Sequence, residues 1–174
     1  LRTALARSKN MVSIRVLQSI GPAAGQEWIT RFGFEADRHP AFLTMALGAG
    51  SVTPLQMASA FGVFANGGHL MRPVLIAKIT DSKGQVLAQD VAEPPSDATR
   101  VIDERNAFVM NSLLQEVTRS GTAASAKRAL GRGDIYGKTG TTNDAMDAWF
   151  AGFHPSMVAV VWIGYDTPRK LGDR

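Results

Sequence analysis

The sequence contains no cysteine. This absence excludes disulfides, thiolate metal sites and cysteine nucleophiles, and it is compatible with either the cytosol or an oxidising compartment. No apolar run approaches the roughly 18 residues of a membrane-spanning helix, and the first residues lack the pattern of a signal peptide. Basic residues do not form a run of about five to eight, so no nucleic-acid partner is expected.

The composition that remains is that of an ordinary globular domain. The 174 residues include 45% hydrophobic and 20% charged residues, with a net charge of +4. A chain of this length buries about 70% of its unfolded surface when it folds. No histidine has a partner at metal-ligand spacing, so we expect no metal or other cofactor, and loop or surface positions for His39, His69 and His154. The core is expected to include Trp28, Trp149 and Trp162.

Hydrophobic periodicity predicts helices in the first part of the chain and strands at its end. Thr53 and Gln56 form a capping-box pattern around Pro54, and Asp103 is a candidate N-cap. The predicted helices cover approximately residues 1–7, 11–20, 23–31, 54–65, 104–119 and 122–130. A peripheral hairpin is predicted from residues 73–80 and 85–88 around a turn at 81–84. Two buried strands are predicted at residues 147–153 and 157–164. The fold class is therefore α+β, with helices first and an antiparallel meander at the C-terminal end.

The stretch from Tyr136 to Asn143 sets a cation, glycines and several hydroxyls side by side. Its Gly-Lys-Thr matches the end of a phosphate-binding loop, but that pattern needs glycine at position 132, which is Arg132. A phosphate loop must also open a helix, whereas this stretch leads into apparent strands. The nucleotide-binding interpretation is therefore rejected.

A second interpretation is a strand that binds a carboxylate-bearing peptide. Gly140 has no Cβ, so another backbone can approach closely. Lys138 supplies positive charge for an anion and favours deprotonation of a nearby hydroxyl. Thr139 and Thr141 lie on the opposite face from Lys138, so one ligand can use both faces only at a sheet edge. On this stretch alone, a solvated lysine beside a glycine turn is the simpler explanation.

A second motif in the sequence favours the peptide-binding strand over the solvated lysine. Lysine-threonine-glycine occurs together with a serine-x-x-lysine nucleophile and a serine-aspartate-asparagine element in β-lactamases and penicillin-binding proteins. Ser8-Lys9-Asn10 is similar to the last of these, with its middle residue relaxed. It lies at a predicted helix junction, where side chains can project into a cleft.

The whole chain resembles the C-terminal part of the transpeptidase domain of class A, bifunctional penicillin-binding proteins of Gram-negative bacteria. The resemblance implies a partial penicillin-binding/β-lactamase-like transpeptidase fold. It is carried, in the family's order, by Ser8-Lys9-Asn10, Phe32-Gly33-Phe34, Leu47-Gly48, Thr53-Pro54-Leu55-Gln56-Met57-Ala58, Ala65-Asn66-Gly67-Gly68, Ser120-Gly121-Thr122-Ala123, Gly137-Lys138-Thr139-Gly140-Thr141-Thr142-Asn143, Asp147-Ala148-Trp149-Phe150-Ala151-Gly152-Phe153 and Trp162-Ile163-Gly164.

The resemblance also implies roles for single residues. Ser8 would relay a proton toward the leaving amine, Asn10 would hydrogen-bond the bound peptide, and Lys138 would polarise Ser8. The substrate or β-lactam carboxylate would be held by Thr139 and Thr141 beside Gly140, with the Thr141 N–H as an oxyanion donor. The reaction would break a D-alanyl-D-alanine bond through a serine ester and pass the acyl group to an amine. The implied partners are peptidoglycan stem peptides, β-lactam antibiotics and other cell-wall synthesis proteins.

The family's Ser-x-x-Lys element is not found in this sequence. Only seven residues precede Ser8, and no serine has a lysine three positions later. We therefore interpret residues 1–174 as a single partial transpeptidase domain, and expect that the isolated chain is not acylated by a β-lactam. The parent would lie on the periplasmic face of the inner membrane, held by an N-terminal anchor absent from this chain. The competing interpretation is a noncatalytic peptide-binding, β-lactam-binding or scaffold module.

Overall fold

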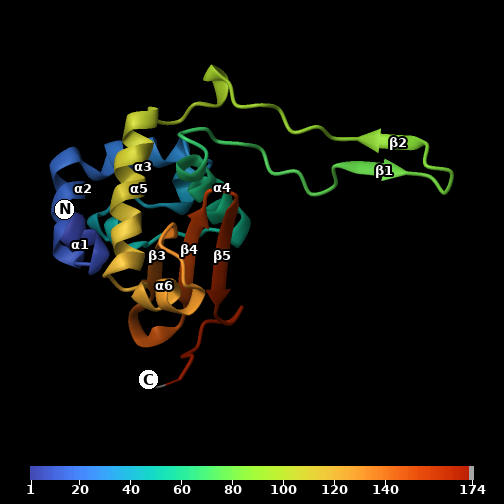
Figure 1. Cartoon of the computed structure of the whole chain (residues 1–174). Helices are drawn as coiled ribbons and strands as arrows, with labels where there is room; N and C mark the ends of the chain where they lie inside the picture. Colours follow the sequence, from blue (N-terminus) through green and yellow to red (C-terminus); the bar gives the residue numbers. More distant parts are fainter. Residues whose placement is uncertain (173–174) are drawn as a thin grey trace.

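The computed structural model describes residues 1–172 and has the predicted α+β class. Helices make up the first part of the chain (Figure 1), and they are α1 (Arg2–Ala6), α2 (Asn10–Ile20), α3 (Pro22–Thr30), the 3₁₀ helices η1 (Ala36–Arg38) and η2 (Leu43–Leu47), and α4 (Pro54–Ala65). The second part contains β1 (Lys78–Thr80), β2 (Val86–Gln89), η3 (Asp97–Thr99), α5 (Glu104–Arg119), α6 (Ala124–Leu130), β3 (Tyr136–Thr141), η4 (Asn143–Ala145), β4 (Ala148–His154) and β5 (Met157–Ile163).

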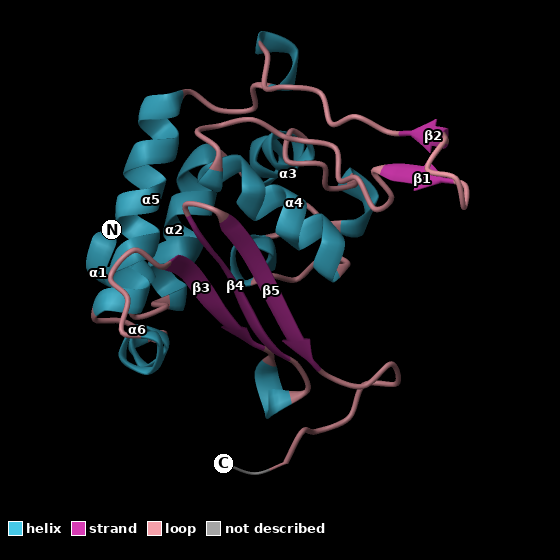
Figure 2. Cartoon of the chain, turned by 45° about the vertical axis from the view of Figure 1, so that its right-hand side comes forward, coloured by secondary structure: helices cyan, strands magenta, loops and turns pink. Residues whose placement is uncertain are grey.

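The C-terminal strands form an antiparallel meander in the order β3-β4-β5 (Figure 2). In its register, Lys138 pairs with Ala151 and Gly140 pairs with Trp149. Helix α4 packs against β4 and β5, while α5 packs against β3. Within the described residues β3 pairs with β4 alone, so it lies at an edge of this sheet.

A small apolar cluster joins α4 to α5. Val63 of α4 is fully buried beside Ile102 and Ala107, with Phe32 and Leu70 packed around them. The segment after α4 comes close to this cluster. A Cβ on Gly68 would lie 2.2 Å from the carbonyl oxygen of Ile102, and its φ is +114°. Only glycine fits this approach without a shift of the backbone.

The predicted helix caps are confirmed. Thr53 accepts from the Gln56 N–H at 3.1 Å, and the Gln56 side chain accepts from the Thr53 N–H at 2.9 Å. Asp103 accepts from the Arg105 N–H at 2.8 Å. Both caps satisfy backbone donors that the first turn of a helix leaves free.

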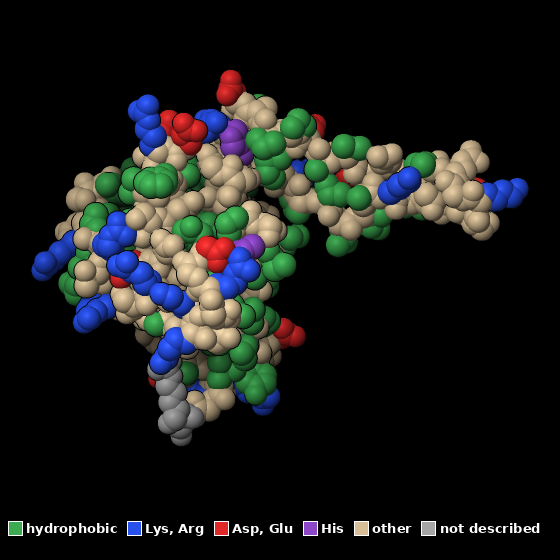
Figure 3. Space-filling model, in the orientation of Figure 1, with side chains coloured by type: hydrophobic (Ala, Val, Ile, Leu, Met, Phe, Trp, Pro, Cys, Tyr) green, Lys and Arg blue, Asp and Glu red, His purple; other side chains and the backbone are tan. Residues whose placement is uncertain are grey.

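The hairpin of β1 and β2 projects away from the body as a long arm (Figure 1). Its turn is closed by Asp81, whose carboxylate accepts from the Lys83 and Gln85 N–H groups at 2.8 Å each. Both strands are exposed along their whole length. Hydrophobic side chains are visible along this arm (Figure 3). The prediction of a peripheral hairpin is confirmed.

The burial predicted for β5 is wrong. Exposed and half-buried side chains alternate from Met157 to Val161, the last three residues are all exposed, and Met157, Val161 and Ile163 are each more than half exposed. An apolar run shows that a strand is favoured, but it does not say how many faces are covered. Here β5 is the second edge of the described sheet, and one of its faces packs against α4.

Two other burial predictions need correction. Trp28 is 49% exposed and Trp162 is 37% exposed, so neither is part of the buried core; the Arg31 guanidinium lies 4.4 Å from the centre of the Trp28 ring. His39 and His69 lie in loops as expected, but both are buried. The Nδ1 atom of His69 lies 3.0 Å from Thr99 Oγ1, so this ring holds the chain ahead of α5 in place.

Candidate active site

The structure brings Ser8 and Lys138 together although 130 residues separate them in the chain. Lys138 Nζ donates to Ser8 Oγ at 2.9 Å and to the Thr139 carbonyl oxygen at 2.8 Å. Ser8 lies between α1 and α2, and Lys138 lies on the edge strand β3. Helix α5 contacts both α1 and β3, so it fixes the distance between the two residues.

The backbone of Ser8 is in a conformation that is uncommon for serine. Its φ is +50°, and its N–H donates to the Leu5 carbonyl oxygen at 3.0 Å just after α1 ends. Glycine usually occupies this left-handed position after a helix, because a side chain there costs about 1 kcal/mol or more. The strained backbone makes Ser8 a candidate for a residue kept for its side chain.

Burial lowers the pKa of Lys138 below its usual 10.5. The cause is desolvation of the ammonium group, which disfavours the charged form. Within residues 1–172, the hydrogen bonds of this ammonium go to Ser8 and Thr139, and it forms no ion pair with a carboxylate. Its charge is therefore available to an anionic ligand.

Thr122 also lies at this site, although it was not identified as a site residue from the sequence. Its Oγ1 lies 2.6 Å from Thr139 Oγ1, and its N–H donates to the Ala6 carbonyl oxygen at 3.0 Å. The signal that could have found it is its place between Gly121 and α6, in the helix junction that precedes the lysine-threonine-glycine strand.

The other predicted site residues flank this group. Asn10 is the first residue of α2 and is exposed, and its side chain makes no hydrogen bond within the described part of the chain. Thr141 is the last residue of β3 and is exposed. A Cβ on Gly140 would meet the Trp149 Cβ at 3.3 Å, so the sheet crowds this glycine only moderately. Because β3 lies at an edge of the described sheet, it has the position that a pairing ligand requires.

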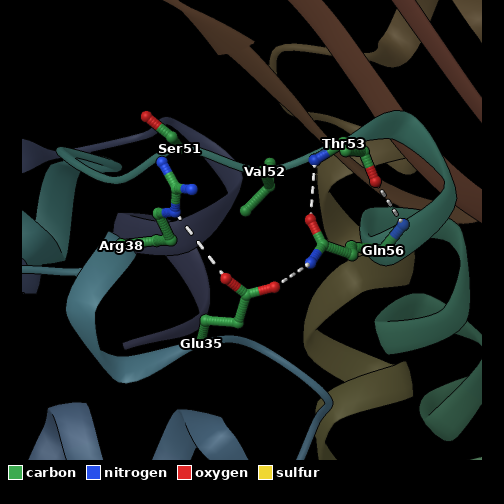
Figure 4. A pocket seen from close by; sticks show the side chains of 6 residues that line it. All are labelled: Glu35, Arg38, Ser51, Val52, Thr53 and Gln56. Atoms are coloured by element: carbon green, nitrogen blue, oxygen red, sulfur yellow. Dashed lines mark hydrogen bonds and ion pairs between the residues drawn. The ribbon is translucent and has the colours of Figure 1, made fainter.

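A separate hollow lies between η1 and the start of α4 (Figure 4). It encloses about 310 Å³, and its lining includes neither Ser8 nor Lys138. In it Glu35 forms an ion pair with Arg38 at 3.7 Å and accepts from Gln56 Nε2 at 3.5 Å. These contacts connect Glu35, directly before η1, to η1 itself and to the first turn of α4.

Neither a metal site nor a membrane span is found in the described residues. No group of three or more His, Asp or Glu residues there could hold a metal ion. No helix in that part of the chain is both long and apolar enough to cross a bilayer.

Comparison with known proteins identifies the family of the chain. Residues 1–170 match the family model described as the penicillin binding protein transpeptidase domain. Penicillin-binding protein 1A of Neisseria lactamica is 52% identical over 173 residues, which are 99% of this chain and 22% of that protein. Penicillin-binding protein 1A of Pseudomonas aeruginosa is 40% identical over 220 residues, covering 100% of this chain and 27% of that protein.

A solved structure agrees with these relatives. The crystal structure of penicillin-binding protein 1A from Haemophilus influenzae matches with a TM-score of 0.91 and 35% identity, over 99% of this chain and 31% of that one. The chain thus spans about a fifth to a third of the length of these relatives. It belongs to the penicillin-binding protein transpeptidase family, and it corresponds to the C-terminal part of the transpeptidase domain of class A members.

Proposed function

We propose that the chain is part of a serine-type D,D-transpeptidase that cross-links peptidoglycan stem peptides and is acylated by β-lactams. The observation that carries this proposal is the 2.9 Å contact between Lys138 Nζ and Ser8 Oγ. It places a cation and a hydroxyl from distant parts of the chain at one point, where the cation also donates to the Thr139 carbonyl oxygen.

The direction of that hydrogen bond assigns a proton path. Because the Lys138 ammonium donates, the Ser8 oxygen accepts and its own proton remains free to go elsewhere. In our proposal this proton goes to the nitrogen of the departing D-alanine as the amide C–N bond breaks, and the proton that the attacking serine gives up replaces it on the Ser8 oxygen, so that Ser8 relays a proton and is restored. The ammonium stabilises the electron-rich Ser8 oxygen while the proton is in transfer.

The ligand carboxylate would lie along the edge of β3. Thr139 and Thr141 would hold it with their hydroxyls, and the absence of a Cβ on Gly140 leaves room for the peptide backbone. The Thr141 N–H would donate to the oxyanion, and Asn10 would donate to the bound peptide. The positive charge of Lys138 adds to the attraction for an anionic ligand.

The nucleophile would come from a part of the parent protein outside residues 1–174. A Ser-x-x-Lys element there would form the acyl-serine ester with release of D-alanine, and the ester would then pass its acyl group to the amine of a second stem peptide. The parent would act on the periplasmic face of the inner membrane, together with other cell-wall synthesis proteins.

The test uses the full-length protein and a synthetic stem pentapeptide. We expect release of free D-alanine and covalent labelling by fluorescent penicillin, both strongly reduced by Ser8→Ala. Ser125→Ala, on the exposed face of α6, serves as a control and should leave both activities unchanged. A full-length protein that binds the peptide without releasing D-alanine and without labelling would be a noncatalytic binding module, contrary to the proposal.

A further inference from the structure

We propose that Thr122 is a positioning residue that orients the hydroxyl of Thr139 toward the carboxylate of the ligand, an inference that rests on the proposed function. The two hydroxyl oxygens are 2.6 Å apart, a short distance for a neutral hydroxyl pair. Thr122 is exposed and Thr139 is half-buried on β3, so the pair borders the open edge of the strand.

The direction of this hydrogen bond matters because each hydroxyl carries a single proton. If Thr139 donates to Thr122, its proton is used and only lone pairs face the ligand. If Thr122 donates to Thr139, the Thr139 proton is free to bind an anion. A carboxylate accepts hydrogen bonds and cannot donate one, so its arrival selects the second arrangement. The resulting chain from Thr122 through Thr139 to the carboxylate is polarised in one direction, which strengthens each bond.

The backbone explains why Thr122 can take this position. Its N–H donates to the Ala6 carbonyl oxygen at 3.0 Å, two residues before Ser8. A Cβ on Gly121 would lie 2.2 Å from that same oxygen, so glycine is required for the approach. The segment is also fixed by the Gly121 N–H, which donates to the Val117 carbonyl oxygen at 3.1 Å.

Thr122 therefore contacts both sides of the site. Its backbone binds the end of α1, which leads into Ser8, and its side chain binds β3, which carries Lys138 and Thr139. Within the described residues its hydroxyl makes no hydrogen bond to Ser8 or Lys138, so it acts through Thr139. A substitution that removes only the hydroxyl, such as Thr122→Val, breaks the side-chain contact with β3 and keeps the backbone contact with the end of α1.

The test is a double-mutant cycle on the rate of acylation of the full-length protein by benzylpenicillin, whose carboxylate would bind Thr139. Thr122→Val should slow acylation about three- to tenfold, the range of one neutral hydrogen bond. Thr122→Ser should restore most of the rate, because serine also donates. In a Thr139→Val background, Thr122→Val should have almost no further effect, because its target hydroxyl is gone.

The controls separate this inference from the proposed function. Ser125→Ala should leave the rate unchanged, and the thermal midpoint of Thr122→Val should match that of the unaltered protein. If the protein is acylated and Thr139→Val slows it, but Thr122→Val does not, the inference is wrong and the proposed function stands. The inference would also be wrong if Thr122→Val slowed acylation equally in the unaltered protein and in the Thr139→Val protein. If the unaltered protein is not acylated at all, both proposals fall.

Discussion

Replacing Lys138 by methionine should slow acylation strongly without lowering stability. Methionine keeps much of the length and apolar character of the lysine stem, but it cannot donate to Ser8 Oγ or to the Thr139 carbonyl oxygen. A hydrogen bond made by a charged group contributes about 1.5–3 kcal/mol. If that bond is present in the transition state, its loss slows acylation of the full-length protein by about 10- to 150-fold.

Lys138→Met should slow acylation, but it should not lower the stability of the folded protein. The pKa of Lys138 is lowered by desolvation, so the folded site disfavours the ammonium that the unfolded chain solvates freely. Between the folded pKa and 10.5, the unfolded chain binds more protons, and the stability of the unaltered protein rises with pH across this window. Below the window the desolvation cost is present in full. Lys138→Met removes this cost, so its thermal midpoint at neutral pH should equal or exceed that of the unaltered protein.

The assay is the rate of labelling by fluorescent penicillin as a function of pH, with the thermal midpoint measured on the same samples. The unaltered protein should lose activity on the alkaline side at a pH below 10.5, as Lys138 loses its proton. Lys138→Met should lack this alkaline limb, while Lys83→Met in the exposed hairpin turn should behave as the unaltered protein. A Lys138→Met protein that stays folded and labels at the normal rate would refute the role given to this ammonium.

Three further substitutions test the strand and its support. Gly137→Ala should lower the free energy of unfolding by about 1–3 kcal/mol, because its Cβ would lie 2.8 Å from both the Ala151 carbonyl oxygen and the Phe150 ring; an unchanged denaturation curve would contradict this. Gly140→Ala, with a nearest contact of 3.3 Å, should cost less stability than Gly137→Ala but slow penicillin labelling, and normal labelling would argue against close approach of the ligand backbone there. Thr118→Val should lower the free energy of unfolding by about 1–3 kcal/mol, because the buried Thr118 hydroxyl donates to the Ile135 carbonyl oxygen at 2.6 Å just before β3; a thermal midpoint equal to that of the unaltered protein would refute this.

Features set by neighbouring residues could be predicted from the sequence. The Thr53 capping box, the Asp103 cap and the turn at Asp81 each depend on atoms a few residues apart, and all three are present in the structure. The antiparallel order of the last strands follows from short connections between apolar runs in the same way.

Features set by tertiary packing could not be predicted in this way. The approach of Ser8 to Lys138 depends on how α5 packs between α1 and β3, and only the family resemblance suggested it. The stretch Ser120-Gly121-Thr122-Ala123 contributed to the family resemblance, but no role followed for Thr122, because its contact with Thr139 forms only when the chain folds. The exposure of β5 depends on which elements cover it, which an apolar run does not encode.

The most direct test of the account is to find where benzylpenicillin attaches to the full-length protein, using tandem mass spectrometry of its peptides. We predict one penicilloyl group on a serine of a Ser-x-x-Lys element outside residues 1–174, its formation slowed by Lys138→Met. The 174-residue chain alone, treated in the same way, should gain no mass. A penicilloyl group on Ser8 or on any other residue of this chain would contradict the claim that these residues assist a nucleophile that lies elsewhere.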